Sequence, residues 1–184
     1  MRKILVALAF VFGPFFSNAQ LYTAKPGSTN ISFFSAAPLE DIEAVNKSAI
    51  IVLNAAQNDF QMKVRIETFT FKNALMKEHF NENYMESEKY PECVFRGKIN
   101  ETVDYTKDGE TKVTVTGKME MHGVTKDVTI PGTITKSGND LKLNAKFKIK
   151  IAEYNIKVPS MYVKNIAEEV EVTFSTTLEE YKKK

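Results

Sequence analysis

The sequence holds very little of the chemistry on which most enzymes depend. It has one cysteine and two histidines among 184 residues, and His79 and His122 belong to different expected elements. Neither histidine has a metal-binding neighbour at a standard spacing. The sequence also lacks HExxH, GxSxG and a phosphate-binding glycine loop. We therefore expect no enzyme, no catalytic residue, no metal and no cofactor.

The single cysteine, Cys93, excludes a disulfide within the chain, so the stability of the fold has to come from a hydrophobic core. Cys93 could be a free thiol or an intermolecular link. Its place beside Phe95 favours a third interpretation, a small buried residue.

The N-terminal segment, residues 1–19, differs from the rest of the chain. It combines a basic start, an apolar run from Ile4 to Phe16 and a small-residue ending before Gln20. This pattern predicts a secretory signal peptide, and the run is too short to span a bilayer. No cysteine follows it, so a lipid-modified N-terminus is not indicated. We expect a periplasmic or secreted protein, residues 20–184, without a stable membrane anchor.

The charges of residues 20–184 balance. Removing residues 1–19 takes away two of the 25 basic residues and none of the 23 acidic ones, which leaves 23 of each sign. A nucleic-acid partner would call for a basic surplus, so none is expected. One domain of this length is large enough to bury a real core.

Most of the remaining sequence alternates between apolar and polar residues, as half-buried β-strands do. The clearest segments are Phe60–Glu67, Val113–His122, Leu141–Ile151 and Glu169–Leu178. About eight strands are predicted in all. Leu21–Asn30 is expected to be a polar coil, and Leu39–Asn46 fits a helix or a strand.

The predicted fold is all-β, because eight antiparallel strands with one apolar face each can close into a barrel. An open sandwich is the alternative. A single open sheet is disfavoured, since it would leave one apolar face uncovered.

The stretch Phe69–Phe95 interrupts this pattern with one short helix. Asn73 is a plausible N-cap, and the residues after it are good helix formers. Apolar residues at four-residue spacing form two adjoining stripes, Leu75 with His79 and Met76 with Phe80 and Tyr84. The helix could be a plug that closes one end of the barrel or a lid over a cavity, and periodicity does not distinguish these roles.

The inward faces of the predicted strands contain unusual residues. Methionine occupies positions where valine or isoleucine is more common in strands. Its flexible thioether side chain adapts to an interior of irregular shape or variable contents. Glycine lies inside three strands, where it marks a bend or leaves room for a ligand. These residues are Met62, Met119, Met121, Gly97, Gly117 and Gly132. Gap filling would explain any single methionine, but together with the helix they favour a cavity.

Three blocks of the sequence resemble the YceI-like family of bacterial periplasmic proteins, which is named for polyisoprenoid binding. They are HFNENYMESEKYPECVF at 79–95, GKMEMHGVTKDV at 117–128, and EYNIKVP at 153–159 followed by IAEEV at 166–170. The hairpin block at 117–128 is the most specific. The helix block departs from the commonest family form in its longer NALMKEHFNENYM, at 73–85.

The resemblance implies an extended, lipocalin-like, eight-stranded antiparallel barrel with the helix near its mouth. It also implies non-catalytic binding or carriage of an isoprenoid-type, quinone-like or other amphiphilic lipid in a tunnel. The residues expected to line this tunnel are Phe60, Met62, Val64, Phe69, Phe71, Leu75, Met76, Phe80, Met119, Met121 and Phe147. The residues expected to contact a polar head group are His79, Asn83 and Tyr84.

Two alternatives remain open at this stage. A structural or protein-interaction module would have a filled barrel core and would dock a partner on the apolar helix face. A weaker alternative is a lipid-modifying enzyme with His79 as its base. A homodimer is also possible through an open seam of the barrel.

Overall fold

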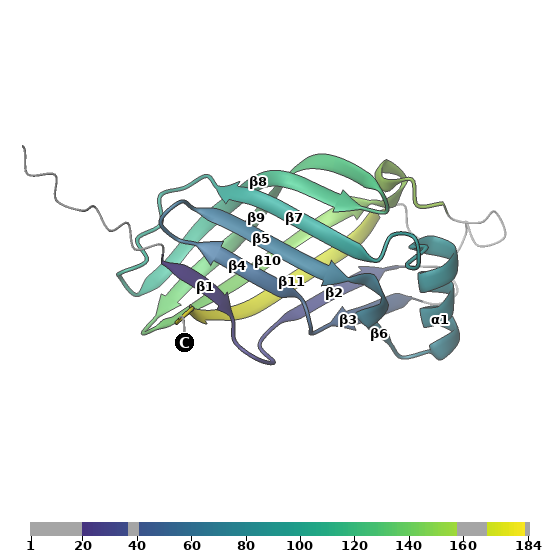
Figure 1. Cartoon of the computed structure of the whole chain (residues 1–184), viewed down its shortest axis with the longest axis horizontal. Coiled ribbons are helices and arrows are strands. Elements are labelled where there is room, and N and C mark those ends of the chain that lie inside the picture. The colour runs from purple at the N-terminus through teal and green to yellow at the C-terminus, as the bar shows by residue number, and fades with distance from the viewer. Residues whose placement is uncertain (1–19, 37–40, 158–168, 183–184) are drawn as a thin grey trace, which may run out of the picture.

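The computed structural model describes residues 20–36, 41–157 and 169–182. The predicted signal peptide and residues 158–168, which precede the last strand, lie outside these ranges. The described chain forms an elongated antiparallel barrel with one helix at its end (Figure 1).

Eight strands form the closed ring of the barrel. Each pairs antiparallel with its neighbours, and the pairing of Tyr22 with Glu180 closes the ring. This confirms the all-β barrel that the sequence predicts. In ring order the strands are β1 (Leu21–Ala24), β4 (Ile50–Asn54), β5 (Asp59–Arg65), β7 (Glu92–Ile99), β8 (Gly109–Met121), β9 (Val124–Ser137), β10 (Asp140–Lys150) and β11 (Glu169–Glu180).

Three further strands, β2 (Asn30–Ser35), β3 (Ile42–Asn46) and β6 (Thr70–Phe71), extend one side of the barrel towards the helix (Figure 1). β2 pairs with the first half of β11, β3 with β2, and β6 with β3. Along the chain they adjoin β1, β4 and β5 in turn, each across a short break. We call this three-stranded extension the flap.

The structure changes the sequence prediction for one segment and resolves an ambiguity in another. Leu21–Ala24 is not a coil but a strand, because its backbone completes the ring between β4 and β11. Four residues are too few to show an alternation, so only long-range pairing defines this strand. Within the ambiguous stretch, Ile42–Asn46 is a strand.

The helix α1 (Ala74–His79) begins as the sequence predicts. The side-chain oxygen of Asn73 accepts a hydrogen bond from the Leu75 N–H at 2.9 Å. A single π-helical turn, Phe80–Tyr84, continues it. In Figure 1 the helix lies across the end of the barrel at which the flap projects.

The opposite end of the barrel is filled. Leu53, Leu141 and Leu178 have no exposed surface there, and the rings of Tyr22 and Tyr105 lie 6.4 Å apart. Burial of such side chains contributes roughly 1.5–3 kcal/mol each. This packed end supplies much of the core that the chain needs in the absence of a disulfide.

Gly97 and Gly117 lie opposite each other in β7 and β8. A Cβ atom at Gly117 would lie 2.1 Å from the carbonyl oxygen of Arg96 and 2.3 Å from the Cα of Gly97. The two backbones therefore approach more closely than any side chain allows. The sequence analysis offered a bend or room for a ligand at these glycines, and the structure shows a different role at Gly97 and Gly117, close contact between two strands.

Candidate functional site: an apolar cavity beneath the helix

An apolar cavity of ≈160 Å³ lies inside the barrel at the helix end. Strands of the ring, the flap and the helical segment all contribute to its wall. Nine of the residues predicted to contact a ligand line it: Met62, Val64, Phe69, Met76, Phe80, Tyr84, Met119, Met121 and Phe147.

Strand alternation explains why the methionines reach this cavity. Met119 lies opposite Phe95 on β7, and Met62 lies opposite the same phenylalanine from β5. Partners across an antiparallel pair point to the same face of the sheet. Met119 and Met121 are accordingly buried.

The other predicted contacts lie elsewhere. Phe60 lines a smaller cavity of ≈60 Å³ towards the filled end, and Phe71 packs in the flap outside the wall. Leu75 is 55% exposed, Asn83 is exposed, and His79 is half-buried on the helix, so none of these three is part of the wall. The helix turns the Met76 stripe inwards and the adjoining Leu75 stripe outwards, whereas the sequence analysis placed both stripes on the tunnel wall.

Several wall residues were not predicted. Cys93 shares an inward face with Phe95, so strand alternation in β7 could have identified it. Phe33 comes from the flap strand β2, and Ile156 follows the 3₁₀ turn Ile151–Tyr154. The sequence shows no local signal that these segments fold over the cavity.

Four phenylalanines join the helix to the flap. The ring of Phe80 stacks on Phe33 at a centroid distance of 5.3 Å and contacts Phe71 at 5.0 Å and Phe69 at 5.7 Å. Such pairs add about 0.5–1.5 kcal/mol each beyond their buried area. This aromatic cluster holds the lid in place over the cavity.

His122 joins three segments around the cavity mouth. It occupies the tight turn between β8 and β9 with φ of 51°. Its Nδ1–H donates to the carbonyl oxygen of Tyr154 at 3.0 Å, and its Nε2 lies 2.8 Å from a carboxylate oxygen of Glu86. The ring of Tyr90 packs against the imidazole at 4.5 Å. The hairpin, the segment after the helix and the 3₁₀ turn are thereby tied together.

Replacing His122 with alanine is expected to lower the free energy of unfolding by about 2 kcal/mol, because a buried carbonyl loses its donor. Glu86 is partly exposed and regains water, which limits the loss. Urea denaturation of His122→Ala measures the change. The matched control His79→Ala removes the other histidine, and we expect a loss below about 1 kcal/mol for it. Equal losses in the two variants would contradict the structural role of His122.

Cys93 is partly exposed, and because it lines the cavity, its exposed surface faces the cavity interior. Burial, assisted by the Glu120 carboxylate, raises the pKa of this thiol to about 12. Cys93 is therefore neutral at physiological pH and is a poor nucleophile.

We expect Cys93 in the folded protein to react slowly with Ellman's reagent at pH 8, since almost no thiolate is present at that pH. After unfolding in urea the thiol should react fast and stoichiometrically. Absorbance of the released thiol product measures both rates. Equal rates in the two states would show that the thiol is accessible in the fold.

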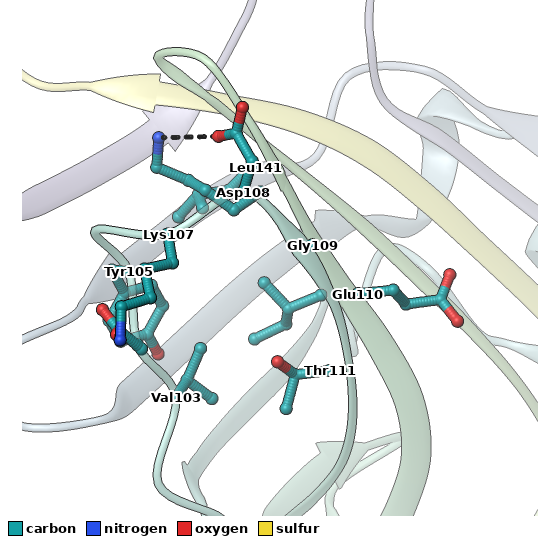
Figure 2. A pocket seen from close by; sticks show the side chains of 11 residues that line it. Val103, Tyr105, Lys107, Asp108, Gly109, Glu110, Thr111 and Leu141 are labelled. Carbon is teal, nitrogen blue, oxygen red and sulfur yellow. Dashed lines mark ion pairs between the residues drawn. The ribbon is translucent and has the colours of Figure 1, made fainter.

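A second hollow of ≈180 Å³ lies against the loop between β7 and β8 (Figure 2). Four of its charged side chains form two ion pairs, Lys136 with Asp108 at 4.0 Å and Lys107 with Asp104 at 3.2 Å. Hydrogen bonds from Thr106 lower the pKa of Asp104 to about 2. These contacts order the loop, and we assign the hollow to loop structure.

Within the described ranges, no group of three or more His, Cys, Asp or Glu side chains could hold a metal ion. No helix in this part of the chain is long and apolar enough to cross a membrane.

The fold and cavity define a small antiparallel barrel with an apolar interior and a helical lid. A model of the YceI-like domain matches residues 22–178, and the chain belongs to this family. The predicted resemblance is thus confirmed.

Individual relatives agree with this family. A UPF0312 protein of Photorhabdus laumondii is 30% identical over 111 residues, which is 56% of this chain and 55% of that protein. The match thus spans about half the length of that relative. A polyisoprenoid binding domain from Saccharophagus degradans, implicated in plant cell wall breakdown, has a TM-score of 0.75 at 13% identity over 87% of this chain and 98% of its own. BcnA of Burkholderia cenocepacia has a TM-score of 0.71 at 20% identity, covering 84% and 98%. At these identities the two structures support the fold alone.

Proposed function

We propose that the protein binds an isoprenoid-type or other amphiphilic lipid in the cavity beneath the helix, without changing it chemically. The observation that carries this proposal is the almost wholly apolar wall of the ≈160 Å³ cavity. Each CH₂ group moved from water to such a site contributes about 0.8 kcal/mol. The polyisoprenoid-binding description of the Saccharophagus domain, which has a similar fold, supports an isoprenoid-type ligand.

The cavity volume limits what fits without rearrangement. An engineered apolar cavity of about 150 Å³ binds benzene, so ≈160 Å³ accepts a ring or about one isoprene unit. The smaller cavity shares Ile31, Met62, Phe147 and Val172 with the larger one. A longer tail would extend along this shared wall, where methionine side chains can change rotamer.

The wall supports a binding role rather than a catalytic one. Its one thiol, Cys93, is neutral at physiological pH. Among the three predicted head-group contacts, only Tyr84 lies on the wall. We propose that it orients a polar head group. The predicted signal peptide supports a periplasmic or secreted location for this binding.

Native mass spectrometry of residues 20–184, followed by organic extraction, tests the proposal. We expect a stoichiometric adduct that extracts as a long apolar molecule. A bare mass that persists after incubation with mixed bacterial lipids would overturn the proposal and favour a protein-interaction module. The same spectrum gives the oligomeric state and tests the expected possibility of a homodimer.

A further inference from the structure

The wall of the barrel is split along part of its length between β9 and β10. These strands pair from Ser137 with Asp140 to Gly132 with Ala145. Beyond that point, and among the residues that the structure describes, residues 124–131 pair only with β8, and residues 146–150 pair only with β11. We call the gap between these two fully described segments the split.

Both sides of the split carry residues that are typical of free strand edges. Pro131 is the first residue of β9 without a partner in β10. Proline has no N–H to donate and is tolerated in a strand only where no neighbouring strand needs one. On β10, the outward residues beside the split are lysines 146, 148 and 150. Charged side chains, especially lysine, protect exposed edges from wrong pairing. The split is therefore built into the sequence.

Solvent reaches the inner face of the sheet at the split. In the paired part of β10, Leu141 and Leu143 are buried, whereas Phe147 and Ile149 in the unpaired part are half-buried. Lys126 lies opposite the buried Met119 and therefore belongs to the inner face of β9, yet it is exposed. A lysine at an inward position is tolerated only where water is close.

Both cavities border the split. The smaller cavity is lined by Pro131, Gly132 and Ala145, where the pairing ends. The larger one is lined by Phe147 and Ile149, further along the unpaired part of β10. Phe147 belongs to both walls and so stands between the split and the apolar interior.

The two ends of the barrel are held more firmly than the split. Opening the helix end would break the cluster around Phe80 and the contacts of His122 with Tyr154 and Glu86. The other end is filled by side chains without exposed surface, such as Leu53. Within the described ranges, parting the split breaks no strand pair, and the side chains that it displaces, such as Phe147, are half-buried.

We propose that the split between β9 and β10 is a lateral portal through which an apolar chain reaches the cavity, while the helix stays closed. This inference rests on the proposed lipid binding and adds the route to it. The apolar tail passes between Phe147 and the facing edge of β9, and the exposed Lys126 marks the aqueous rim of the portal.

A cross-link across the split tests the portal. Ala145 pairs with Gly132, so Lys148 and Thr129 lie at the same level on the two edges, and both are exposed. The double variant Thr129→Cys/Lys148→Cys is joined with a short bis-maleimide. The matched control Thr135→Cys/Lys142→Cys joins the same strands where they already pair. The native Cys93 faces the cavity and its thiol is neutral at physiological pH, so it does not compete for the reagent.

The readout is uptake of N-phenyl-1-naphthylamine, whose fluorescence rises in apolar surroundings, measured by stopped flow. We expect the cross-link at the split to slow uptake by about tenfold or more, which corresponds to a barrier higher by about 1.4 kcal/mol. The control cross-link should leave the rate unchanged. Uptake at equal rates in both proteins would overturn the portal alone. No fluorescence rise in the protein without cross-links would overturn the portal together with the proposed lipid binding.

Discussion

Gly117→Ala is expected to lower the free energy of unfolding by more than about 3 kcal/mol, at or beyond the upper end of ordinary overpacking penalties. The added Cβ would lie 2.1 Å from the Arg96 carbonyl oxygen and 2.3 Å from the Gly97 Cα. Both are backbone atoms of the neighbouring strand, so no side-chain rotation can relieve the contact. β7 and β8 would have to separate in the middle of the ring. A small domain has only about 5–15 kcal/mol of stability to lose.

Gly138→Ala is the matched control for this prediction. Gly138 has φ of 57°, and no atom lies within 4 Å of a Cβ built on it. Alanine there should cost only the roughly 1–2 kcal/mol of a left-handed backbone conformation. Urea denaturation of both variants gives the comparison. A loss for Gly117→Ala no larger than that of the control would mean that the two strands do not lie as close as the structure places them.

Met119→Trp is expected to abolish lipid binding while the barrel stays folded. Met119 is 3% exposed, lines the ≈160 Å³ cavity and lies in register between Phe95 and Lys126. An indole at this position would occupy much of the space in which a ligand is proposed to bind. The cavity itself accepts the added volume, which limits the overpacking cost to about 1–3 kcal/mol.

The adduct fraction in native mass spectra measures the effect, with circular dichroism as the check on folding. Met119→Leu removes the thioether but leaves the space, so it should keep its ligand. Leu75→Trp adds the same indole on the exposed side of the helix and should also leave occupancy unchanged. Full occupancy in folded Met119→Trp would show that this face of β8 does not hold the ligand.

Most of this fold could be predicted from the alternation of apolar and polar residues along the strands. This alternation assigned Met119, Met121 and Phe147 to the inside of the barrel because a strand has only two faces, and the structure places all three on the cavity wall. The N-cap at Asn73 was equally local, since it depends on one side chain and the first helical turn.

The features that the sequence did not predict depend on pairing between distant residues. Strand β1 is recognisable only from its partners in β4 and β11. The sequence analysis assigned both apolar stripes of the helix to the tunnel, and packing of Phe80 against the flap turns only the Met76 stripe towards the cavity. The split is equally non-local, because Lys126 and Pro131 become informative only when the register of β9 with β10 is known.

The closure of the ring between Tyr22 and Glu180 has a consequence for the order of events in folding. The first strand of the ring meets its last one only when almost the whole chain has been synthesised. Until then β1 and the growing end of the sheet have no mutual partner, and loop-closure entropy opposes their meeting. Folds dominated by such distant contacts form slowly, in milliseconds to seconds. The ring can thus close only after Glu180 has been synthesised, and a shorter nascent chain lacks the strand that pairs with β1.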